Sequence, residues 1–399
     1  MHPLPAFRRT LAWTAAALVV AGSAVAVAAA PAGSFGQVTG FGANPGNLSM
    51  YSYVPASLPS TAPLVVALHG CTQSATDYYQ HSGWSQYADQ WGFAVVFPQQ
   101  SSTNNPQSCF DWYTPSDDGR GKGEAESIRE MVSYAQSTYH SDAKRVFVTG
   151  LSAGGGMTAD LLADYPDVFA GGAINSGLPA QCAGSLVQAT SCQYSNQNKT
   201  PTQWGDLVRA ADPGYGGPWP RVAIWQGTAD TTVSPVNATE LRDQWTNVWG
   251  LGQTPSSTVG IGNTTESVYN DPQGKPAVEV YSVSGMAHGL AVHPGSGADS
   301  CGSTGPYYLD YICATYHTAV FWGLNPGGAT PPPTTTTTSP PVQCFTASNY
   351  AHTVAGRAYQ SGGYTYAVGS NDAMGLWNVA VTTNLSETSA GYYQLVPSC

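Results

Sequence analysis

The stretch VFVTGLSAGGG, residues 146–156, places a single serine among glycines directly after a run of strand-forming residues. Its first four residues favour an extended strand, and residues 157–165, MTADLLADY, have helical spacing. A serine at a sharp turn between a strand and a helix has a strained backbone, so its neighbours two positions away must be small. Gly150 and Gly154 meet this need around Ser152 in a G-x-S-x-G pattern, which presents a nucleophilic serine at the edge of a sheet. Ordinary glycine-rich turns also match such short patterns, so the assignment of Ser152 as a nucleophile depends on the rest of the chain.

Segments of strand type and of helix type alternate along the chain on both sides of this turn. Apolar runs of strand length occupy residues 63–70, 92–100, 145–150, 169–177, 221–227 and 277–285, and helical spacing occupies 123–139, 157–165 and 307–323. Continuous apolar strands interleaved with amphipathic helices indicate a mostly parallel sheet with helices on both faces. This α/β architecture is the setting that a nucleophilic serine turn requires.

The first thirty residues are typical of a secretory signal peptide. Arg8 and Arg9 precede an alanine-rich apolar stretch that ends in small residues near position 28. We therefore expect residues 1–30 to be removed on export and the mature protein to be extracellular. No second long apolar run follows, so we expect no membrane association after removal of the signal.

The charge balance excludes one large class of partners. Asp and Glu number 24 against 13 Lys and Arg, which gives a net charge of -11. Because nucleic-acid binding needs basic patches that neutralise phosphate, we expect no nucleic-acid partner. An acidic, tyrosine-rich chain with few charged residues is better suited to a neutral substrate.

Eight cysteines in an exported chain suggest four disulfides. Sequence alone does not fix their connectivity, but the spacings suggest that neighbours pair in order. The suggested pairs are Cys71–Cys109, Cys182–Cys192, Cys301–Cys313 and Cys344–Cys399. A zinc cluster would need C-x-x-C pairs or paired histidines, which the sequence lacks, so no metal site is expected.

The chain divides at residues 327–341, GGATPPPTTTTTSPP. Proline and threonine without apolar residues cannot form a core, so we expect a semi-rigid linker between a catalytic domain at 31–326 and a tail at 342–399. The tail is too small for a large core, and the suggested Cys344–Cys399 disulfide would stabilise it by joining its two ends. It holds more aromatic residues than such a core needs, so some are expected on a face that stacks against a solid surface.

A serine nucleophile needs a base, and the base needs an acid that orients it. In hydrolases with this serine turn the order along the chain is Ser, then Asp or Glu, then His. Asp230 lies just beyond the predicted strand at 221–227, at the same sheet edge as Ser152, and is the expected acid. Asp299 is the substitute, although no strand leads into it.

The base must follow the acid in the chain. His288 comes after the predicted strand at 277–285 and is flanked by glycine and small residues that would let a substrate approach. His293 lies five residues later and spacing alone does not dismiss it. His317 falls within the predicted closing helix, which favours a packing role. We prefer His288.

The negative oxygen that develops during ester cleavage needs donors already aimed at it. One N–H group comes from the residue after the nucleophile, Ala153, and the second from a loop after an early strand. His69 and Gly70 turn the chain in that loop, and the N–H of Cys71 can face the cleft. A Cys71–Cys109 bridge would hold the loop rigid. His69 precedes the serine and belongs to the loop, so we do not assign it as the base.

Five segments carry a resemblance to a known family: LHGCTQ (68–73), CFDWY (109–113), GLSAGGGMTADLLADYPDVFAGGAINSG (150–177), QGTADTTVSP (226–235) and GMAHG (285–289). Together they resemble the secreted esterase family of polyhydroxybutyrate depolymerases, which also includes feruloyl and acetylxylan esterases. The resemblance implies an α/β-hydrolase fold and a triad of Ser152, Asp230 and His288. One departure is the segment GLAVHPGSG (289–297), because family members often have an aromatic residue and more glycines after the histidine.

The tail is similar to the substrate-binding domain that such depolymerases carry behind threonine-rich linkers. This resemblance covers most of residues 344–399 and includes His352 and Arg357, which it implies as substrate-binding residues. Trp377 is expected on the stacking face, and Trp112, close to Cys109, is a candidate for the substrate cleft. Related small modules also occur on chitin-degrading enzymes, so the tail alone does not name the polymer.

These patterns together predict an extracellular serine esterase that hydrolyses insoluble poly(3-hydroxybutyrate) or related short-chain polyesters. We expect a monomer that needs no cofactor. A feruloyl or acetylxylan esterase with a polysaccharide-binding tail is the alternative within esterases. A binding protein built on a degenerate hydrolase scaffold belongs to a different class, and any turnover of p-nitrophenyl butyrate would exclude it.

Overall fold

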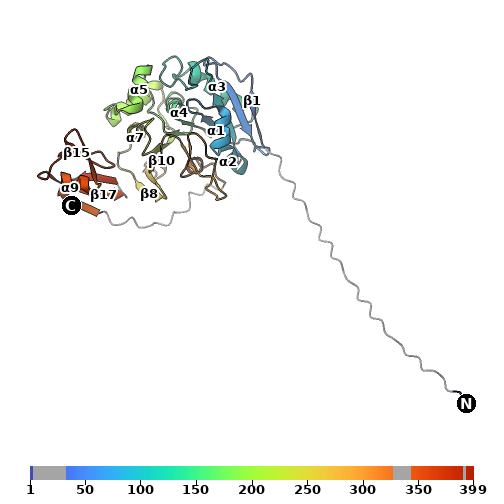
Figure 1. The fold of residues 1–399 in the computed structure, drawn as a ribbon. Coiled ribbons are helices and arrows are strands. Elements are labelled where there is room, and N and C mark those ends of the chain that lie inside the picture. Colours follow the sequence, from blue (N-terminus) through green and yellow to red (C-terminus); the bar gives the residue numbers. More distant parts are fainter. Residues whose placement is uncertain (3–32, 327–342, 390–391) are drawn as a thin grey trace.

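The computed structural model describes residues 1–2, 33–326, 343–389 and 392–399 (Figure 1). The predicted signal peptide, apart from its first two residues, and the predicted linker lie outside the described residues. The described chain forms two folded parts, which we call the body (33–326) and the tail (343–399).

A ten-stranded sheet forms the centre of the body, and its middle is parallel. In the order β1-β2-β4-β3-β5-β6-β7-β10-β9-β8, the strands from β4 to β10 pair in parallel. These strands are β4 (Ala94–Gln99), β3 (Leu64–Leu68), β5 (Val146–Leu151), β6 (Gly171–Asn175), β7 (Arg221–Gly227) and β10 (Pro276–Val283). Each overlaps an apolar run of the sequence, because strands covered on both faces need apolar residues throughout. The prediction of a mostly parallel sheet is confirmed.

Both edges of the sheet are antiparallel, a feature that the apolar runs of the sequence do not predict. One edge consists of β1 (Ser34–Val38) and β2 (Ser49–Val54), and the other of β9 (Thr264–Asn270) and β8 (Ser257–Ile261). The outermost strands β1 and β8 contain no fully buried residue. An edge strand of this kind lacks the continuous apolar run that marks the central strands.

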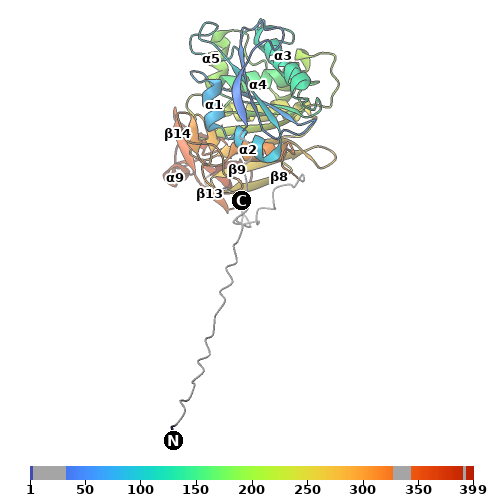
Figure 2. The same ribbon diagram turned by 90° about the vertical axis from the view of Figure 1, so that its right-hand side faces the viewer.

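Helices cover the two faces of the sheet (Figures 1 and 2). One layer contains α3 (Gly123–Thr138), α4 (Ala153–Asp164), α6 (Pro201–Ala211) and α7 (Val236–Val248), with the short α5 (Leu186–Tyr194) beside it. The other contains α1 (Ala75–His81), α2 (Trp84–Trp91) and α8 (Ala314–Phe321). In β3, Val66 belongs to the first core and Val65 to the second, as the period of two along a strand requires.

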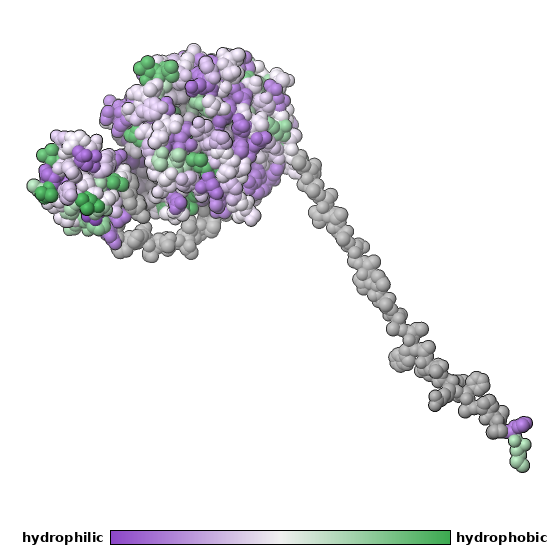
Figure 3. Space-filling model, viewed as in Figure 1, coloured by the Kyte–Doolittle hydropathy of each residue, from purple (hydrophilic) through white to green (hydrophobic). Residues whose placement is uncertain are grey.

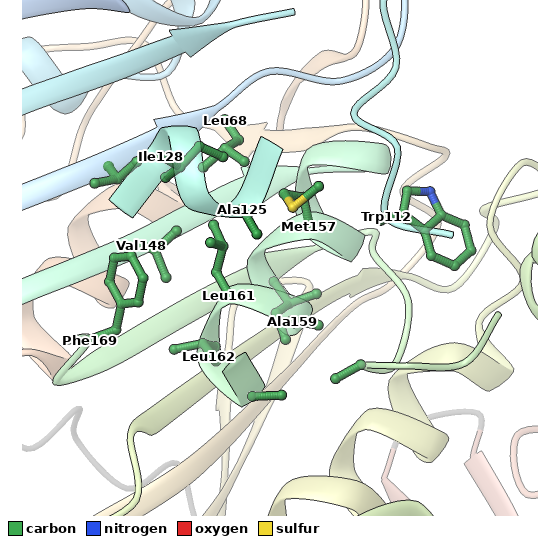
Figure 4. Close-up of a cluster of buried hydrophobic side chains, with 14 of the residues drawn as sticks. Leu68, Trp112, Ala125, Ile128, Val148, Met157, Ala159, Leu161, Leu162 and Phe169 are labelled. Atoms are coloured by element: carbon green, nitrogen blue, oxygen red, sulfur yellow. The ribbon is translucent and has the colours of Figure 1, made fainter. Parts of the chain in front are cut away.

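The first core is built mainly where α3 and α4 lie against the parallel strands (Figure 4). Ile128 of α3 and Met157 and Leu161 of α4 are all fully buried beside Val148 of β5. The helix that follows Ser152 is therefore anchored along its length. This anchoring also holds the serine turn in place, because Ser152 directly precedes the first residue of α4.

The expected helix at 307–323 is only partly correct. The helix α8 begins at Ala314, whereas β12 (Tyr308–Asp310) pairs in parallel with β11 (Leu290–Val292). Cys313 caps α8, since its Sγ accepts a hydrogen bond from the N–H of Tyr316 at 3.0 Å. The residues before the cap pair with a distant strand, and helical spacing alone does not reveal such pairing.

The tail consists of two small antiparallel sheets and one helix. One sheet contains β13 (Gln343–Ser348), β17 (Thr382–Ser389) and β18 (Tyr392–Val396), and the other contains β14 (Ala358–Ser361), β15 (Tyr364–Ala367) and β16 (Ala373–Leu376). The helix is α9 (Asn349–Val354). The buried apolar core of the described tail comprises Ala358, Ala367, Met374 and Leu385.

All eight cysteines are paired in the order that the spacings suggest. The bonds are Cys71–Cys109, Cys182–Cys192, Cys301–Cys313 and Cys344–Cys399. Within the described ranges, no helix is both long enough and apolar enough to cross a membrane.

Candidate active site

Ser152 lies in the sharp turn between β5 and α4. Its backbone has φ 59° and ψ −119°, a conformation that is strained for a residue with a side chain. The turn is held by a hydrogen bond of 2.9 Å from the N–H of Ser152 to the carbonyl of Asn175. A Cβ atom at Gly150 would collide with the backbone of Gly154, and one at Gly154 would collide with the carbonyl of His69. The two glycines of the motif are therefore required by close backbone packing.

Asp230 lies beyond the end of β7 and contacts His288. Its Oδ2 lies 2.8 Å from His288 Nδ1, and the Asp230 side chain is wholly buried. Its Oδ1 accepts hydrogen bonds from the N–H groups of Thr232 at 2.9 Å and Val233 at 2.8 Å. Gln226 Nε2 donates to Oδ2 at 3.1 Å. The carboxylate is thus fixed from four directions with one oxygen aimed at the imidazole.

These contacts determine the charge state of the acid. Burial acts to raise the pKa of Asp230, but hydrogen bonding and charge interaction with His288, together with the two N–H donors, outweigh it. The pKa of Asp230 therefore lies below its ordinary value, so the group is an anion at neutral pH. An anion at this position favours the tautomer of His288 that carries its proton on Nδ1, in which Nε2 can accept a proton.

The other candidates for acid and base lie elsewhere. His293 Nδ1 is 3.1 Å from Asp310 Oδ1, and the side chain of His293 is 47% exposed. Asp299 is exposed in the loop before Cys301. His317 lies in α8 beside the rings of Trp225 and Tyr281, which agrees with the expected packing role.

Ser152 and His288 open into one cleft of about 570 Å³. The cleft is also lined by Leu151, Ala153, Leu178, Val233 and Tyr307, by residues 70–73 of the loop after β3, and by several residues of α5. Its lining residues include no Asp, Glu, Lys or Arg. A neutral, largely apolar acyl group would therefore fit beside the serine.

Two residues that line this cleft, Ala153 and Cys71, carry N–H groups that are candidate donors to a negative oxygen. Ala153 is the first residue of α4, where N–H groups have no partner within the helix. Cys71 lies in the loop after β3, bonded to Cys109. Neither N–H group donates to an acceptor within the described part of the chain. A Cβ atom at the neighbouring Gly70 would lie 3.5 Å from Cβ of Ser152, so the loop passes close to the serine turn.

A buried polar network beneath the Cys71 loop was not predicted from the sequence. His69 Nδ1 lies 2.7 Å from the carbonyl of Gly70, and its Nε2 accepts from the N–H of Gln100 at 3.1 Å. Burial lowers the pKa of His69 to about 4, so the ring is neutral, and it serves the loop and not the chemistry. Gln73 Oε1 accepts from the N–H of Gly70 at 2.7 Å. This network fixes the backbone that carries the Cys71 donor.

The network continues to a buried carboxyl group at the start of α3. Gln100 Nε2 donates to Glu124 and, at 3.1 Å, to the carbonyl of Cys109, while the N–H of Asp111 donates to Glu124 Oε2 at 2.9 Å. Burial raises the pKa of Glu124 to about 8. From the sequence, Glu124 looks like an ordinary acidic residue in the first turn of a helix. Only the fold shows that Glu124 supports the Cys71 loop.

Comparison with known proteins now identifies the family. A family model described as Esterase PHB depolymerase matches residues 48–270, which include Ser152 and Asp230. The chain belongs to this family. It is 48% identical over 289 residues to Poly(3-hydroxyalkanoate) depolymerase C of Paucimonas lemoignei, a match that covers 72% of this chain and 70% of that protein. As a member of this family, the chain is a carboxylic-ester hydrolase.

Other esterases are similar to the chain at lower identity. The chain is 39% identical over 277 residues to Acetylxylan esterase of Coprinopsis cinerea, covering 67% of this chain and 72% of that protein. It is 39% identical over 265 residues to Feruloyl esterase B of Talaromyces stipitatus, covering 64% and 72%. The solved structure of an acetyl xylan esterase from Aspergillus awamori matches with a TM-score of 0.59 at 34% identity, covering 64% of this chain and 94% of that one. These matches and the layered sheet establish the α/β-hydrolase fold.

Trp112 of this esterase lines the cleft, as predicted from the sequence. Its ring lies against Gly156 of α4, where a Cβ atom would meet the indole, and the residue is only 5% exposed (Figure 4). Trp112 therefore forms a fixed wall of the cleft. Its contact with substrate stays a prediction.

His352 of the tail does not have the placement that substrate binding requires. It is fully buried, with Nε2 3.1 Å from the carbonyl of Thr383 and Nδ1 accepting from Arg357 Nε at 3.1 Å. The expectation that His352 touches a polymer is therefore corrected, because a side chain without exposed surface cannot reach one. Arg357 lies half-buried over the ring of Phe345, 4.5 Å from its centroid.

Trp377, in contrast, lies on the tail's surface. It is 42% exposed, and its ring centroid is 5.5 Å from that of the exposed Tyr350. Trp377 Nε1 donates to Thr353 Oγ1 at 3.0 Å, which fixes the orientation of the ring. The pair forms an oriented aromatic surface suited to stacking.

Proposed function

We propose that this esterase hydrolyses poly(3-hydroxybutyrate) or related short-chain polyhydroxyalkanoates to oligomers and monomers outside the cell. The observation that carries the substrate assignment is the 48% identity to a poly(3-hydroxyalkanoate) depolymerase, against 35–39% for the acetylxylan and feruloyl esterases. The uncharged lining of the cleft supports it, because a polyester has no ionic group to pair.

In the proposed reaction Ser152 Oγ attacks the ester carbonyl carbon while His288 Nε2 takes the hydroxyl proton. Asp230 holds the imidazole through Nδ1 and stabilises the imidazolium that forms. The N–H groups of Ala153 and Cys71 donate to the negative oxygen of the tetrahedral intermediate. Collapse of this intermediate breaks the ester bond, and His288 returns the proton to the leaving alcohol.

Water completes the reaction at the acyl-enzyme. His288 takes a proton from a water molecule, whose oxygen attacks the acyl carbon, and the second tetrahedral intermediate is held by the same two N–H groups. When it collapses, His288 returns the proton to Ser152 Oγ and the hydroxy acid leaves. The cycle needs no other reactant than ester and water.

The division of the chain supports a second role for the tail. We assign residues 1–30 as a signal peptide, 31–326 as the catalytic domain, 327–341 as a linker and 342–399 as a polymer-binding domain. Trp377 and Arg357 are the proposed polymer contacts of this domain. Four disulfides support secretion, since such bonds persist in oxidising compartments. We propose that the secreted enzyme acts as a monomer.

Clearing of a polyhydroxybutyrate suspension, measured beside the release of ferulate and acetate from arabinoxylan, tests the substrate. We expect clearing and the appearance of soluble hydroxybutyrate products, with Ser152→Ala as the inactive control. Release of ferulate or acetate without clearing would overturn the polyester assignment and favour the alternative that the sequence leaves open.

A further inference from the structure

The large hydrophobic residues that the body exposes are concentrated at the cleft. Among described residues 33–326 they are Leu186 at 66%, Val187 at 81%, Tyr194 at 54% and Tyr307 at 44% exposure. Leu186 and Tyr307 line the cleft that holds Ser152. Val187 and Tyr194 belong to the same helix as Leu186, and an apolar patch is visible on the surface at α5 (Figures 1 and 3). Exposed apolar residues gathered at one place mark an interaction surface.

One face of the helix α5 lines the cleft, and a neighbouring face lies outside it. Leu186, Ala189, Thr190 and Gln193 line the cleft at the spacing i, i+3, i+4 and i+7 of one helix face. Val187 and Tyr194 are two turns apart on a neighbouring face and do not line the cleft. The segment LVQATSCQY contains no charged residue at all. The outer face, which also carries the exposed Ser191, is therefore continuous with the substrate cleft and remains uncharged beyond it.

Several bonds hold α5 as a rigid platform. Cys192 is bonded to Cys182, and the Ser185 side chain caps the start of the helix. Gln193 Nε2 donates to the carbonyl of Thr232 at 2.7 Å, and the Gln193 carbonyl accepts from Ser234 at 2.8 Å. These bonds connect α5 to the loop that carries the catalytic acid. A surface seated on α5 would consequently be held in a fixed position relative to the triad.

We propose that the outer face of α5, with Val187 and Tyr194, is a second polymer-docking surface that seats the catalytic domain directly on the polyester. This inference rests on the proposed function. Each repeat of a poly(3-hydroxyalkanoate) presents an alkyl side group and an ester with no hydrogen-bond donor, so an uncharged surface with exposed apolar side chains complements it. A polysaccharide presents hydroxyl groups on every ring and would need polar partners that Val187 cannot supply.

The tail and the α5 face would then have different tasks. The tail keeps the enzyme near the solid, whereas the α5 face brings the cleft against a polymer chain in the orientation for attack. Changes in the α5 face should therefore reduce polymer cleavage even when adsorption through the tail is intact.

The test uses the full-length protein with Val187→Asp and Tyr194→Lys combined. An acid in the first turn and a base in the last turn both suit the helix dipole, so α5 itself should remain folded. The matched control is Thr258→Asp, which adds a charge at an exposed position of β8 at the far edge of the sheet. All proteins are assayed for clearing of polyhydroxybutyrate, binding to the granules and hydrolysis of p-nitrophenyl butyrate.

We expect the double variant to clear the polymer about tenfold more slowly, which is the scale of one or two apolar side chains losing their contact. Hydrolysis of the soluble ester should stay within about twofold of wild type, and Thr258→Asp should match wild type in every assay. When Trp377→Ala is added to the double variant, this protein should also bind fewer granules than the Trp377→Ala single variant does.

Unchanged clearing in the double variant would overturn the inference while leaving the proposed function intact. Failure of the wild type to clear the polymer would instead refute the proposed function itself. A wild-type dimer that the double variant converts to monomer, seen by analytical ultracentrifugation, would assign the face to a second copy of the chain and overturn the docking proposal.

Discussion

The body and the tail treat apolar side chains in opposite ways. The body buries its large residues in two cores on the two faces of one sheet, and its few exposed ones lie at α5 and the cleft. The described tail has a core of four residues and exposes twice that number of large hydrophobic side chains. These exposed side chains are Tyr350, Val354, Tyr359, Tyr364, Leu376, Trp377, Val379 and Leu395.

The contrast shows two ways to stabilise a folded part of the chain. The body is large enough to be held by burial, and its disulfides mainly fix loops around the cleft. The tail has little to bury, so a bond between Cys344 and Cys399, 55 residues apart, limits the unfolded chain instead. Because the tail does not need all its aromatic residues for folding, the exposed ones are available to bind a surface.

The largest effect that we expect comes from the base of the triad. His288→Ala should reduce kcat for soluble esters by roughly 10^4-fold or more, because both proton transfers pass through its Nε2. His293→Ala should change kcat by less than about twofold, since that side chain pairs with Asp310 outside the cleft. Granule binding should be unchanged in both variants, because we propose that it resides in the tail and the α5 face. Retained turnover in His288→Ala, with loss in His293→Ala, would show that the wrong histidine was assigned.

A smaller loss is expected when the oxyanion loop is freed. Replacing both Cys71 and Cys109 by serine should lower kcat about 100-fold, the usual result of misplacing one donor, while KM changes little. The Cys182–Cys192 pair does not hold a proposed oxyanion donor, so its double serine variant should keep most of its activity on soluble esters. Stopped assays of p-nitrophenyl butyrate give both constants. Equal losses in the two double variants would mean that the Cys71 loop has no special role.

The bond that staples the tail gives a third, smaller effect. Cys344→Ser with Cys399→Ser should destabilise the tail by about 4 kcal/mol, the cost expected for a loop of this length. Clearing of the polymer should fall about tenfold, whereas hydrolysis of soluble esters should not change. If soluble-ester activity fell as much as polymer clearing, the tail would be a structural support of the body. The contrast between a body held by burial and a separate tail held by its disulfide would then be wrong.

The weakest effect concerns buried carboxyl groups, which the body has and the described tail lacks. Asp164 of α4 is 2% exposed; burial, helped by the negative charge of Asp118, raises its pKa to about 8. In the unfolded chain Asp164 loses its proton above the ordinary aspartate pKa of 3.8, whereas in the folded state it keeps the proton up to about pH 8. The free energy of unfolding therefore falls as the pH rises from about 4 to 8.

Asp164→Asn removes this titration while keeping the shape of the side chain. The Tm of the body should fall from pH 5 to pH 8 by a few degrees less in the variant than in wild type, as measured by loss of soluble-ester activity on heating. Identical pH dependence in both proteins would show that Asp164 is ionised in the folded state. The melting of the tail should show no corresponding difference.

Local motifs account for what the sequence could predict. The Ser152 turn, the position of Asp230 after a strand and the apolar central strands are each encoded within a few residues, and the structure places them as expected. The burial of His352, the short pairing of β11 with β12 and the support of Glu124 to the Cys71 loop all depend on contacts between distant segments. A single sequence carries no signal for such contacts, since a buried and an exposed Glu at a helix start look the same.

The most direct test of the central claim is to find the acyl group on the enzyme. Protein mixed with p-nitrophenyl butyrate, quenched in acid within milliseconds and digested, is mapped by mass spectrometry. A butyryl group on the peptide that contains Ser152, present in wild type and absent in Ser152→Ala, is the predicted result. A butyryl group on another residue, or full turnover by Ser152→Ala, would contradict the account.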